Sequence, residues 1–240
     1  MYKRQKTASE RNSTTIHAVY IGDLNTIATD TVIMYCHGNR DHLDFYWQRT
    51  KLLANAGGKH RYGVLMIDYR GYGLSDGKPT EAGLYADVNA GLRWLRDGGL
   101  SSDRLIMYGF SLGSAPATEM AAYHQRYALK PSKLILEAPF ASTAVMVQDA
   151  SLLSMPSSFF TSVNVNNADK IRAVDIPLLW MHGTNDSFLN INTHGEVVYK
   201  NYGGPRAEAK RIPGADHGDL PKIMGFETYN QAIVQFITAQ

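Results

Sequence analysis

Cysteine is almost missing from this sequence of 240 residues, in which Cys36 is the only example. A lone cysteine cannot form an intrachain disulfide, and it excludes a metal site built from several cysteines. Its position inside an apolar run indicates an inert buried thiol rather than a nucleophile. This cysteine usage slightly favours the cytoplasm and leaves export open if a leader was removed.

The sequence also lacks a long hydrophobic run and an excess of charge of one sign. No segment approaches the roughly 20 apolar residues that cross a bilayer, and the N-terminus lacks the apolar core of a signal peptide. Charged residues make up 19% of the chain and the formal net charge is +2. We therefore expect no nucleic-acid partner and no transmembrane segment, and we interpret the basic residues 1–6 as a solvated terminus.

Short apolar runs recur along the chain and predict β-strands. They occupy residues 31–38, 62–71, 104–110, 133–139, 177–183 and 209–214. Most of them show no polar alternation, which is typical of parallel strands that are covered on both faces. Helical patterns occupy residues 45–55, 80–96, 113–127, 193–202 and 221–238 between and after them. This order predicts one α/β domain over residues 1–240, with a mostly parallel, doubly wound sheet flanked by helices.

Two segments stand outside that regular order. Residues 15–28 are expected to add one or two antiparallel edge strands. The connection over residues 141–175 is long enough to form a short cap or lid over a site, or a helix packed on the surface. It contains the apolar stretch SLLSMPSSFF at residues 151–160, which suits either an acyl pocket or a cover for the core.

The stretch LIMYGFSLGSAPA at residues 105–117 joins an apolar run to a run of small residues. Its G-x-S-x-G pattern is typical of a strand that turns abruptly into a helix, because little side-chain volume fits beside such a turn. The pattern places Ser111 at the tip of the turn. We interpret Ser111 as a candidate nucleophile.

A serine nucleophile needs a base and an acid, and the chain offers both after later strands. Histidine suits the base because its pKa lies near neutrality, and a buried carboxylate can orient it. Asp186 follows the fifth apolar run and His217 follows the sixth. Because parallel strands end at one sheet edge, we expect Ser111, Asp186 and His217 to meet there as a catalytic triad, in the chain order of the α/β hydrolases.

Other residues at strand ends compete for these roles. Asp68 and Glu137 also end predicted strands, but Asp186 is favoured because the Asn-Asp step after its strand suits a tight loop. His37 is expected to support the loop after the first run, and His182 to play a matching structural part beside the acid.

Two backbone groups are expected to form the oxyanion hole. The N–H of Leu112 directly follows the nucleophile at a helix N-terminus, where the helix dipole strengthens a donor. The second donor is the N–H of Asn39 in the loop after the first run. Gly38 would allow this loop to approach the substrate.

At these residues the chain resembles the α/β-hydrolase family, and in more detail the lipid-related branch that includes the protein depalmitoylases. The segment at residues 68–95, DYRGYGLSDGKPTEAGLYADVNAGLRWL, resembles that branch's signature after its fourth strand. GFSLGSAPA, HGTND and GADHGDL resemble its nucleophile, acid and histidine segments, and the similarity runs from about residue 31 onward. The chain departs from those depalmitoylases because no cysteine precedes Cys36, where they carry a lipidated cluster.

The resemblance implies hydrolysis of carboxylic esters or thioesters with no metal and no organic cofactor, on a small-molecule or lipid-like acyl substrate. We expect a serine hydrolase with an acyl-enzyme intermediate. A peptidase or amidase on the same fold is the first alternative, and a non-catalytic binding module is the second. The sequence does not determine the acyl chain, the leaving group or the oligomeric state.

Overall fold

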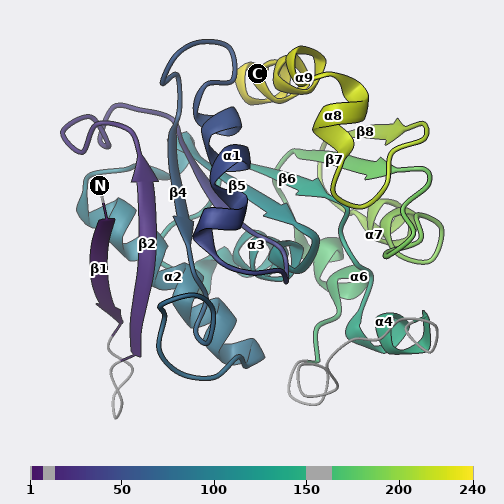
Figure 1. Cartoon of the computed structure of the whole chain (residues 1–240), viewed down its shortest axis with the longest axis horizontal. Coiled ribbons are helices and arrows are strands. Elements are labelled where there is room, and N and C mark those ends of the chain that lie inside the picture. Colours follow the sequence, from purple (N-terminus) through teal and green to yellow (C-terminus); the bar gives the residue numbers. More distant parts are fainter. Residues whose placement is uncertain (1, 8–13, 150–163, 240) are drawn as a thin grey trace.

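The computed structural model describes residues 2–7, 14–149 and 164–239. Its strands form one sheet in the order β1-β2-β4-β3-β5-β6-β7-β8 (Figure 1). Neighbours from β4 to β8 pair in parallel, whereas β1 and β2 extend the sheet as an antiparallel edge. The strands are β1 (Tyr2–Thr7), β2 (Thr14–Ile21), β3 (Val32–Cys36), β4 (Gly63–Ile67), β5 (Leu105–Phe110), β6 (Lys133–Glu137), β7 (Leu178–Gly183) and β8 (Ala207–Ile212).

Each of the six apolar runs overlaps a strand, although β8 begins two residues before its run, so the predicted mostly parallel sheet is confirmed. The edge strand β2 lies in the expected segment but ends at Ile21, and the rest of that segment forms turns. Residues 1–6, interpreted as a solvated terminus, were not expected to form a strand, yet Tyr2–Thr7 forms β1. This strand gains its backbone hydrogen bonds by pairing with β2, in a register that joins Tyr2 to Val19.

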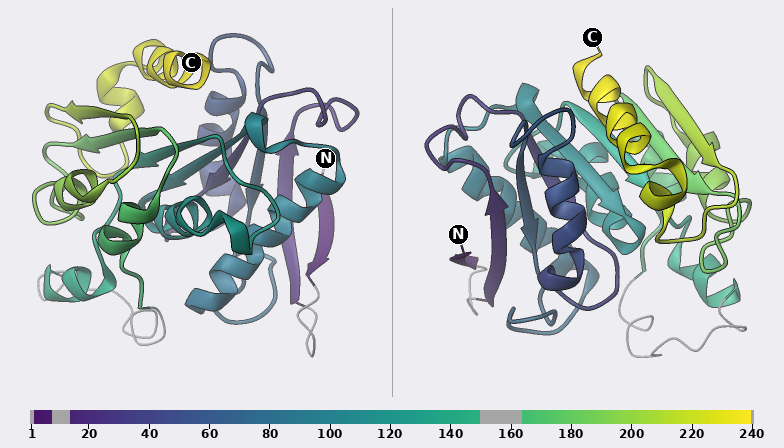
Figure 2. Two further views of the ribbon diagram at one scale, coloured as in Figure 1. Left: turned by 180° about the vertical axis from the view of Figure 1, so that it is seen from behind. Right: turned by 45° about the horizontal axis from the view of Figure 1, so that its top comes forward.

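Helices cover the sheet in two layers, as the predicted doubly wound fold requires (Figures 1 and 2). One face packs against α1 (Leu43–Ala54), α8 (Leu220–Met224) and α9 (Phe226–Thr238). The other face packs against α2 (Glu81–Asp97), α3 (Ser114–Ala122), α6 (Asn167–Lys170) and α7 (Gly195–Asn201). Each layer encloses its own apolar cluster, so the central strands are buried on both sides.

Local chemistry sets several helix ends. Thr80 caps α2, because its side-chain oxygen accepts the Gly83 N–H at 3.0 Å. The predicted helix over residues 113–127 is shorter than expected, since α3 stops at Ala122 and a separate 3-10 turn follows. The predicted helix over residues 221–238 is divided at Gly225, whose φ of 81° is left-handed and interrupts the helical backbone.

The long connection over residues 141–175 begins and ends against the body of the fold. It carries α4 (Thr143–Asp149) and α6. Its two ends pair with each other, because the Thr143 N–H donates to the Val165 carbonyl and the Ala168 N–H donates to the Ala141 carbonyl, both at 2.9 Å. The apolar stretch at residues 151–160, expected to line a pocket or cover the core, lies outside the described residues.

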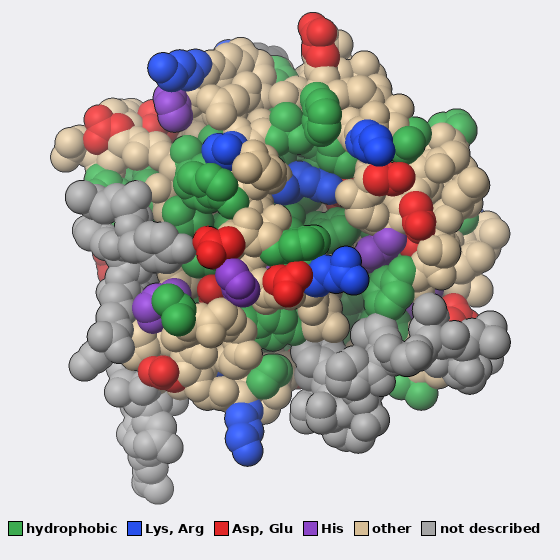
Figure 3. All heavy atoms as spheres, in the orientation of Figure 1, with side chains coloured by type: hydrophobic (Ala, Val, Ile, Leu, Met, Phe, Trp, Pro, Cys, Tyr) green, Lys and Arg blue, Asp and Glu red, His purple; other side chains and the backbone are tan. Residues whose placement is uncertain are grey.

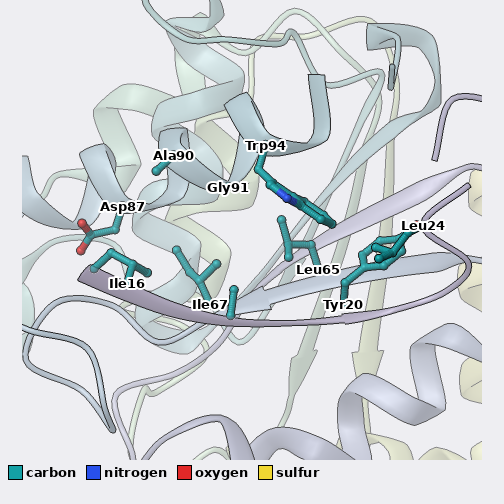
Figure 4. A pocket seen from close by; sticks show the side chains of 10 residues that line it. Ile16, Tyr20, Leu24, Leu65, Ile67, Asp87, Ala90, Gly91 and Trp94 are labelled. Atoms are coloured by element: carbon teal, nitrogen blue, oxygen red, sulfur yellow. The ribbon is translucent and has the colours of Figure 1, made fainter. Parts of the chain in front are cut away.

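An apolar pocket opens between α2 and the antiparallel edge of the sheet (Figure 4). Trp94, Tyr20 and Leu24 line one end of it, and Asp87 lies at the other end. The Asp87 carboxylate is already bound to Arg70 at 2.7 Å. None of the sequence-predicted site residues lines this pocket.

The surface and the helices bear on two further expectations. On the face drawn in Figure 3, basic and acidic side chains of the described residues are interleaved and do not gather into one basic patch. Within the ranges that the structure describes, no helix is both long enough and apolar enough to cross a membrane.

Candidate active site

The turn after β5 holds Ser111 in a backbone conformation that few side chains adopt. Ser111 has a φ of 51°, in the left-handed region that is unfavourable for residues other than glycine. Both glycines of the motif are sterically required. A Cβ atom on Gly109 would lie 2.6 Å from the Gly113 carbonyl oxygen, and one on Gly113 would lie 1.9 Å from the Cys36 carbonyl oxygen. The motif therefore packs the turn directly against the end of β3.

Ser111, His217 and Asp186 meet at the carboxyl edge of the sheet, although they lie far apart in the chain. The Ser111 hydroxyl oxygen lies 2.8 Å from His217 Nε2, and His217 Nδ1 lies 2.8 Å from Asp186 Oδ2. This geometry suits the tautomer in which Nδ1–H donates to the carboxylate and Nε2 accepts from the serine. Ser111 is only 5% exposed, whereas the imidazole of His217 is 19% exposed.

The carboxylate of Asp186 accepts hydrogen bonds on both oxygens. Oδ1 accepts the N–H groups of Phe188 at 3.0 Å and of Leu189 at 2.7 Å, while Oδ2 faces His217 and, at 3.1 Å, His182. Burial acts to raise the pKa of Asp186, but the hydrogen bonds from the two histidines and from the backbone outweigh it. They hold the pKa well below its ordinary value, so the group is ionised at neutral pH.

The imidazole of His217 lies between two aromatic rings. Its centroid is 5.3 Å from that of Phe110 and 5.0 Å from that of Phe188. Phe110 is the last residue of β5 and precedes Ser111, and Phe188 belongs to the loop that carries Asp186. The ring that would act as the base is thus packed between residues that lie one and two positions from its partners Ser111 and Asp186.

The two predicted oxyanion donors belong to the nucleophile turn and to the loop after β3. Leu112 is buried in the 3-10 turn directly after Ser111. The Asn39 side chain accepts a short hydrogen bond from the Tyr72 hydroxyl, and a Cβ atom on Gly38 would lie 2.8 Å from the Tyr46 hydroxyl oxygen. The loop is therefore packed closely at Gly38 and bonded at Asn39, and the role of Asn39 as an oxyanion donor stays a prediction.

The two competing carboxylates bind other groups. Asp68 accepts the Leu43 N–H at 2.9 Å and lies 3.8 Å from His37 Nε2. Glu137 pairs with Arg49 at 2.6 Å. No hydrogen bond or ion pair recorded for the described residues joins either carboxylate to His217, which favours Asp186 as the acid.

The two remaining site histidines occupy structural positions, as their sequence contexts predict. His37 is fully buried between the rings of Tyr46 and Tyr69, and its Nδ1–H donates to the Gly38 carbonyl at 2.8 Å. Burial lowers the pKa of His37 to about 4, so it is neutral under ordinary conditions. His182 Nε2 lies 2.9 Å from the Leu189 carbonyl oxygen, beside the acid.

Sequence reasoning missed one cluster next to the site. Arg49, Tyr108, Glu137 and Tyr229 come together from α1, β5, β6 and α9. These residues are separated by at least 29 positions and share no motif, so the sequence carries no local signal that would group them.

Comparisons with known proteins agree with this architecture. The family model described as "Serine aminopeptidase, S33" matches residues 28–174. Alpha/beta hydrolase domain-containing protein 17C of Mus musculus is 31% identical over 208 residues, which is 86% of this chain and 59% of that protein. Protein 17B of the same name from Homo sapiens is 30% identical over 210 residues, covering 87% and 66%. The chain thus spans about six tenths of the first of these relatives.

Solved structures show the same fold at low sequence identity. An esterase from Pyrococcus furiosus has a TM-score of 0.77 at 18% identity, covering 99% of this chain and 90% of that one. Est1E from Butyrivibrio proteoclasticus, solved with ferulic acid bound, has a TM-score of 0.73 at 16% identity, covering 98% and 100%. At these identities the likeness establishes the fold alone, and it confirms the predicted α/β-hydrolase fold.

Proposed function

The chain belongs to the serine aminopeptidase S33 family of α/β hydrolases, and on that premise we propose that it is a serine hydrolase of carboxylic esters or thioesters. The observation that carries the proposal is the continuous hydrogen-bonded line from the Ser111 hydroxyl through His217 to Asp186, with both contacts at 2.8 Å. A hydroxyl, a neutral imidazole and an ionised carboxylate in that order form an activated nucleophile.

In the proposed acylation step, the Ser111 oxygen attacks the substrate carbonyl while its proton passes to His217 Nε2. Asp186 keeps Nδ1 protonated and stabilises the imidazolium that forms. The negative charge that develops on the carbonyl oxygen is received by the N–H groups of Leu112 and Asn39. The imidazolium then gives its proton to the departing alcohol or thiol, which leaves an acyl-enzyme on Ser111.

Deacylation reverses these roles with water as the nucleophile. His217 removes a proton from a water molecule as that water attacks the acyl-enzyme carbonyl, and it then returns the proton to the Ser111 oxygen. The carboxylic acid is released and the free enzyme is restored. Each proton in the cycle is handled by this one imidazole, so the sequence of steps needs no cofactor.

A small-molecule or lipid-like acyl substrate is the substrate class that we propose. Two features support it: the relatives carry the name of the α/β hydrolases, and the structural neighbours include esterases. Est1E is recorded with ferulic acid, a carboxylic acid, bound to it. An ester or thioester is also the least demanding acyl donor for a triad, because an alcohol or thiol leaves more readily than an amine.

The direct test is turnover of short and long p-nitrophenyl esters by the wild type and by Ser111→Ala. We expect the variant to lose about 10⁶-fold in kcat, which leaves only the residual rate that binding and oxyanion stabilisation supply, with the fold unchanged. Ser114→Ala is the matched control, because Ser114 contacts Asn167 rather than His217. Hydrolysis at close to the wild-type rate in a pure Ser111→Ala preparation would refute the proposal.

A peptidase or amidase remains the second candidate, and the description of the matching family as a serine aminopeptidase favours keeping it. An ester and an amide with the same acyl group separate the two functions. The esterase proposal expects much faster ester turnover, whereas an amide rate equal to the ester rate would favour the peptidase. A folded protein that turns over neither compound would point to a binding module.

A further inference from the structure

A buried charged cluster lies beneath the loop that carries His217. The Nη1 atom of Arg49 lies 2.6 and 2.7 Å from the two carboxylate oxygens of Glu137. The same carboxylate accepts the hydroxyl of Tyr229 at 2.7 Å and that of Tyr108 at shorter range. Glu137 is completely buried and the Arg49 side chain is 14% exposed, so the pair is held largely out of water.

Arg49 reaches beyond this cluster to both sides of the proposed catalytic pair. Its Nη2 atom donates to the Gly218 carbonyl at 3.1 Å, and Gly218 directly follows His217. Its Cζ atom lies 5.4 Å from the ring centroid of Phe110, the residue before Ser111. The ring of Phe110 in turn packs against the imidazole of His217 at 5.3 Å.

Stability alone does not account for such a cluster. Burying an ion pair is expensive, and well-packed apolar residues of similar volume often serve equally well. What a guanidinium offers instead is a rigid planar fork that binds two acceptors in a fixed relation. Here Nη1 of the guanidinium binds Glu137 at the end of β6, and Nη2 donates to the Gly218 carbonyl.

We propose that Arg49 is a positioning residue for His217, which it orients by fixing the Gly218 carbonyl and the Phe110 ring. The inference rests on the proposed function, because it assumes that the angle of this imidazole matters for proton transfer. Glu137 holds the guanidinium in place through both of its carboxylate oxygens. Because Arg49 acts on the ring through its neighbours, its loss changes the chemical step and leaves substrate binding nearly unchanged.

The test variant is Arg49→Lys, which keeps the charge and the pairing with Glu137 but removes the fork. A shift of about 1 Å in a reacting group lowers rates by up to about 100-fold, so we expect kcat to fall about 10- to 100-fold with KM within about twofold. Tyr229→Phe is the matched control. It removes a hydroxyl that contacts both Glu137 and Arg49 but leaves the Arg49 bond to Gly218, and its kcat should stay within about threefold of wild type.

A second readout separates positioning from a general loss of structure. The proton between His217 Nδ1 and Asp186 Oδ2 should give a low-field proton NMR signal, since the bond is charge-assisted. The signal should move or broaden in Arg49→Lys and stay in place in Tyr229→Phe. A folded Arg49→Lys protein with the wild-type kcat and an unmoved signal would overturn the proposal.

Two further measurements cover the cases in which Arg49→Lys does not fold or the wild type hydrolyses no ester. If Arg49→Lys does not fold, the double variant Arg49→Met/Glu137→Gln removes both charges together, and the same fall in kcat and shift of the signal are expected. A wild type that hydrolyses no ester would refute the proposed function only. In that case the low-field signal still decides whether Arg49 orients His217, because it needs no substrate.

Discussion

Two aspartate–histidine pairs lie at the carboxyl edge of the same sheet, and they have opposite character. In one pair, His217 Nδ1 lies 2.8 Å from Asp186 Oδ2 and the ring continues to Ser111. In the other, His37 Nε2 lies 3.8 Å from Asp68 Oδ1, which is too far for a hydrogen bond. The residue types and the position after a strand are the same in both pairs.

The difference comes from the number of hydrogen bonds that each buried carboxylate accepts from the protein. Asp186 accepts two backbone N–H groups and faces two imidazoles, which keep its pKa well below the ordinary value. Asp68 accepts one backbone N–H, from Leu43, and burial raises its pKa to about 6. Burial by itself raises the pKa of a carboxyl group, whereas several donors aimed at its oxygens lower it. The arrangement around Asp186 thus favours the ionised form, which is the form that stabilises an imidazolium.

The largest effect is expected when each aspartate is replaced in turn with asparagine and kcat is measured. Asp186→Asn should lower kcat by about 10⁴-fold, because an amide favours the wrong tautomer of His217. Asp68→Asn should leave kcat within a few-fold of wild type. Steady-state ester hydrolysis on the two folded variants measures both effects. Equal losses in the two variants would show that the distinction drawn between the pairs is wrong.

The pH dependence of stability tests the raised pKa of Asp68, which distinguishes it from Asp186. The folded-state pKa of Asp68, about 6, lies above its unfolded value of about 3.9. Its favourable contribution is therefore complete below about pH 4 and is lost as the pH rises through 6. Asp68→Asn keeps an acceptor for the Leu43 N–H and carries no charge. It should be about as stable as wild type at pH 4 and more stable by roughly 2 kcal/mol at pH 8.

Urea unfolding at the two pH values measures this difference. Asp97→Asn provides the control, because the Asp97 side chain is largely exposed at the end of α2. Its effect on the free energy of unfolding should be small at both pH values. A gain for Asp68→Asn that is the same at pH 4 and pH 8 would contradict the raised pKa assigned to Asp68.

The smallest effect is expected in the loop after β3, which leads from His37 of the second pair to Asn39, the proposed oxyanion donor. His37 precedes Gly38 and Asn39, and the Tyr72 hydroxyl donates to the Asn39 side chain. Tyr72→Phe removes a hydrogen bond that typically contributes about 1 kcal/mol, so kcat should fall about fivefold with little change in KM. Tyr127→Phe is the control, since its hydroxyl binds Glu119 instead. An unchanged kcat in Tyr72→Phe would argue against Asn39 as an oxyanion donor.

The sequence predicted the frame of the site well, because that frame depends on local patterns. Apolar runs mark the parallel strands, and the turn around Ser111 is signalled by glycines that the backbone packing requires. Since parallel strands end together, the positions of Asp186 and His217 after their strands were enough to predict their meeting.

The remaining features depend on contacts between distant segments. Strand β1 has a polar sequence, and its structure comes from pairing with β2. The division between α8 and α9 comes from the left-handed backbone of Gly225. The cluster of Arg49 and Glu137 is assembled from separate elements, and the two aspartate–histidine pairs differ in distances that no spacing in the sequence encodes.

The central claim is that Ser111 is an activated nucleophile, and intact mass after exposure to a fluorophosphonate tests it most directly. We predict a single adduct on the wild type, with the phosphonyl group on the Ser111 oxygen, and none on Ser111→Ala. The Ser114→Ala control should react as the wild type does. A folded wild-type protein that gains no adduct, or an adduct that persists in Ser111→Ala, would contradict the account.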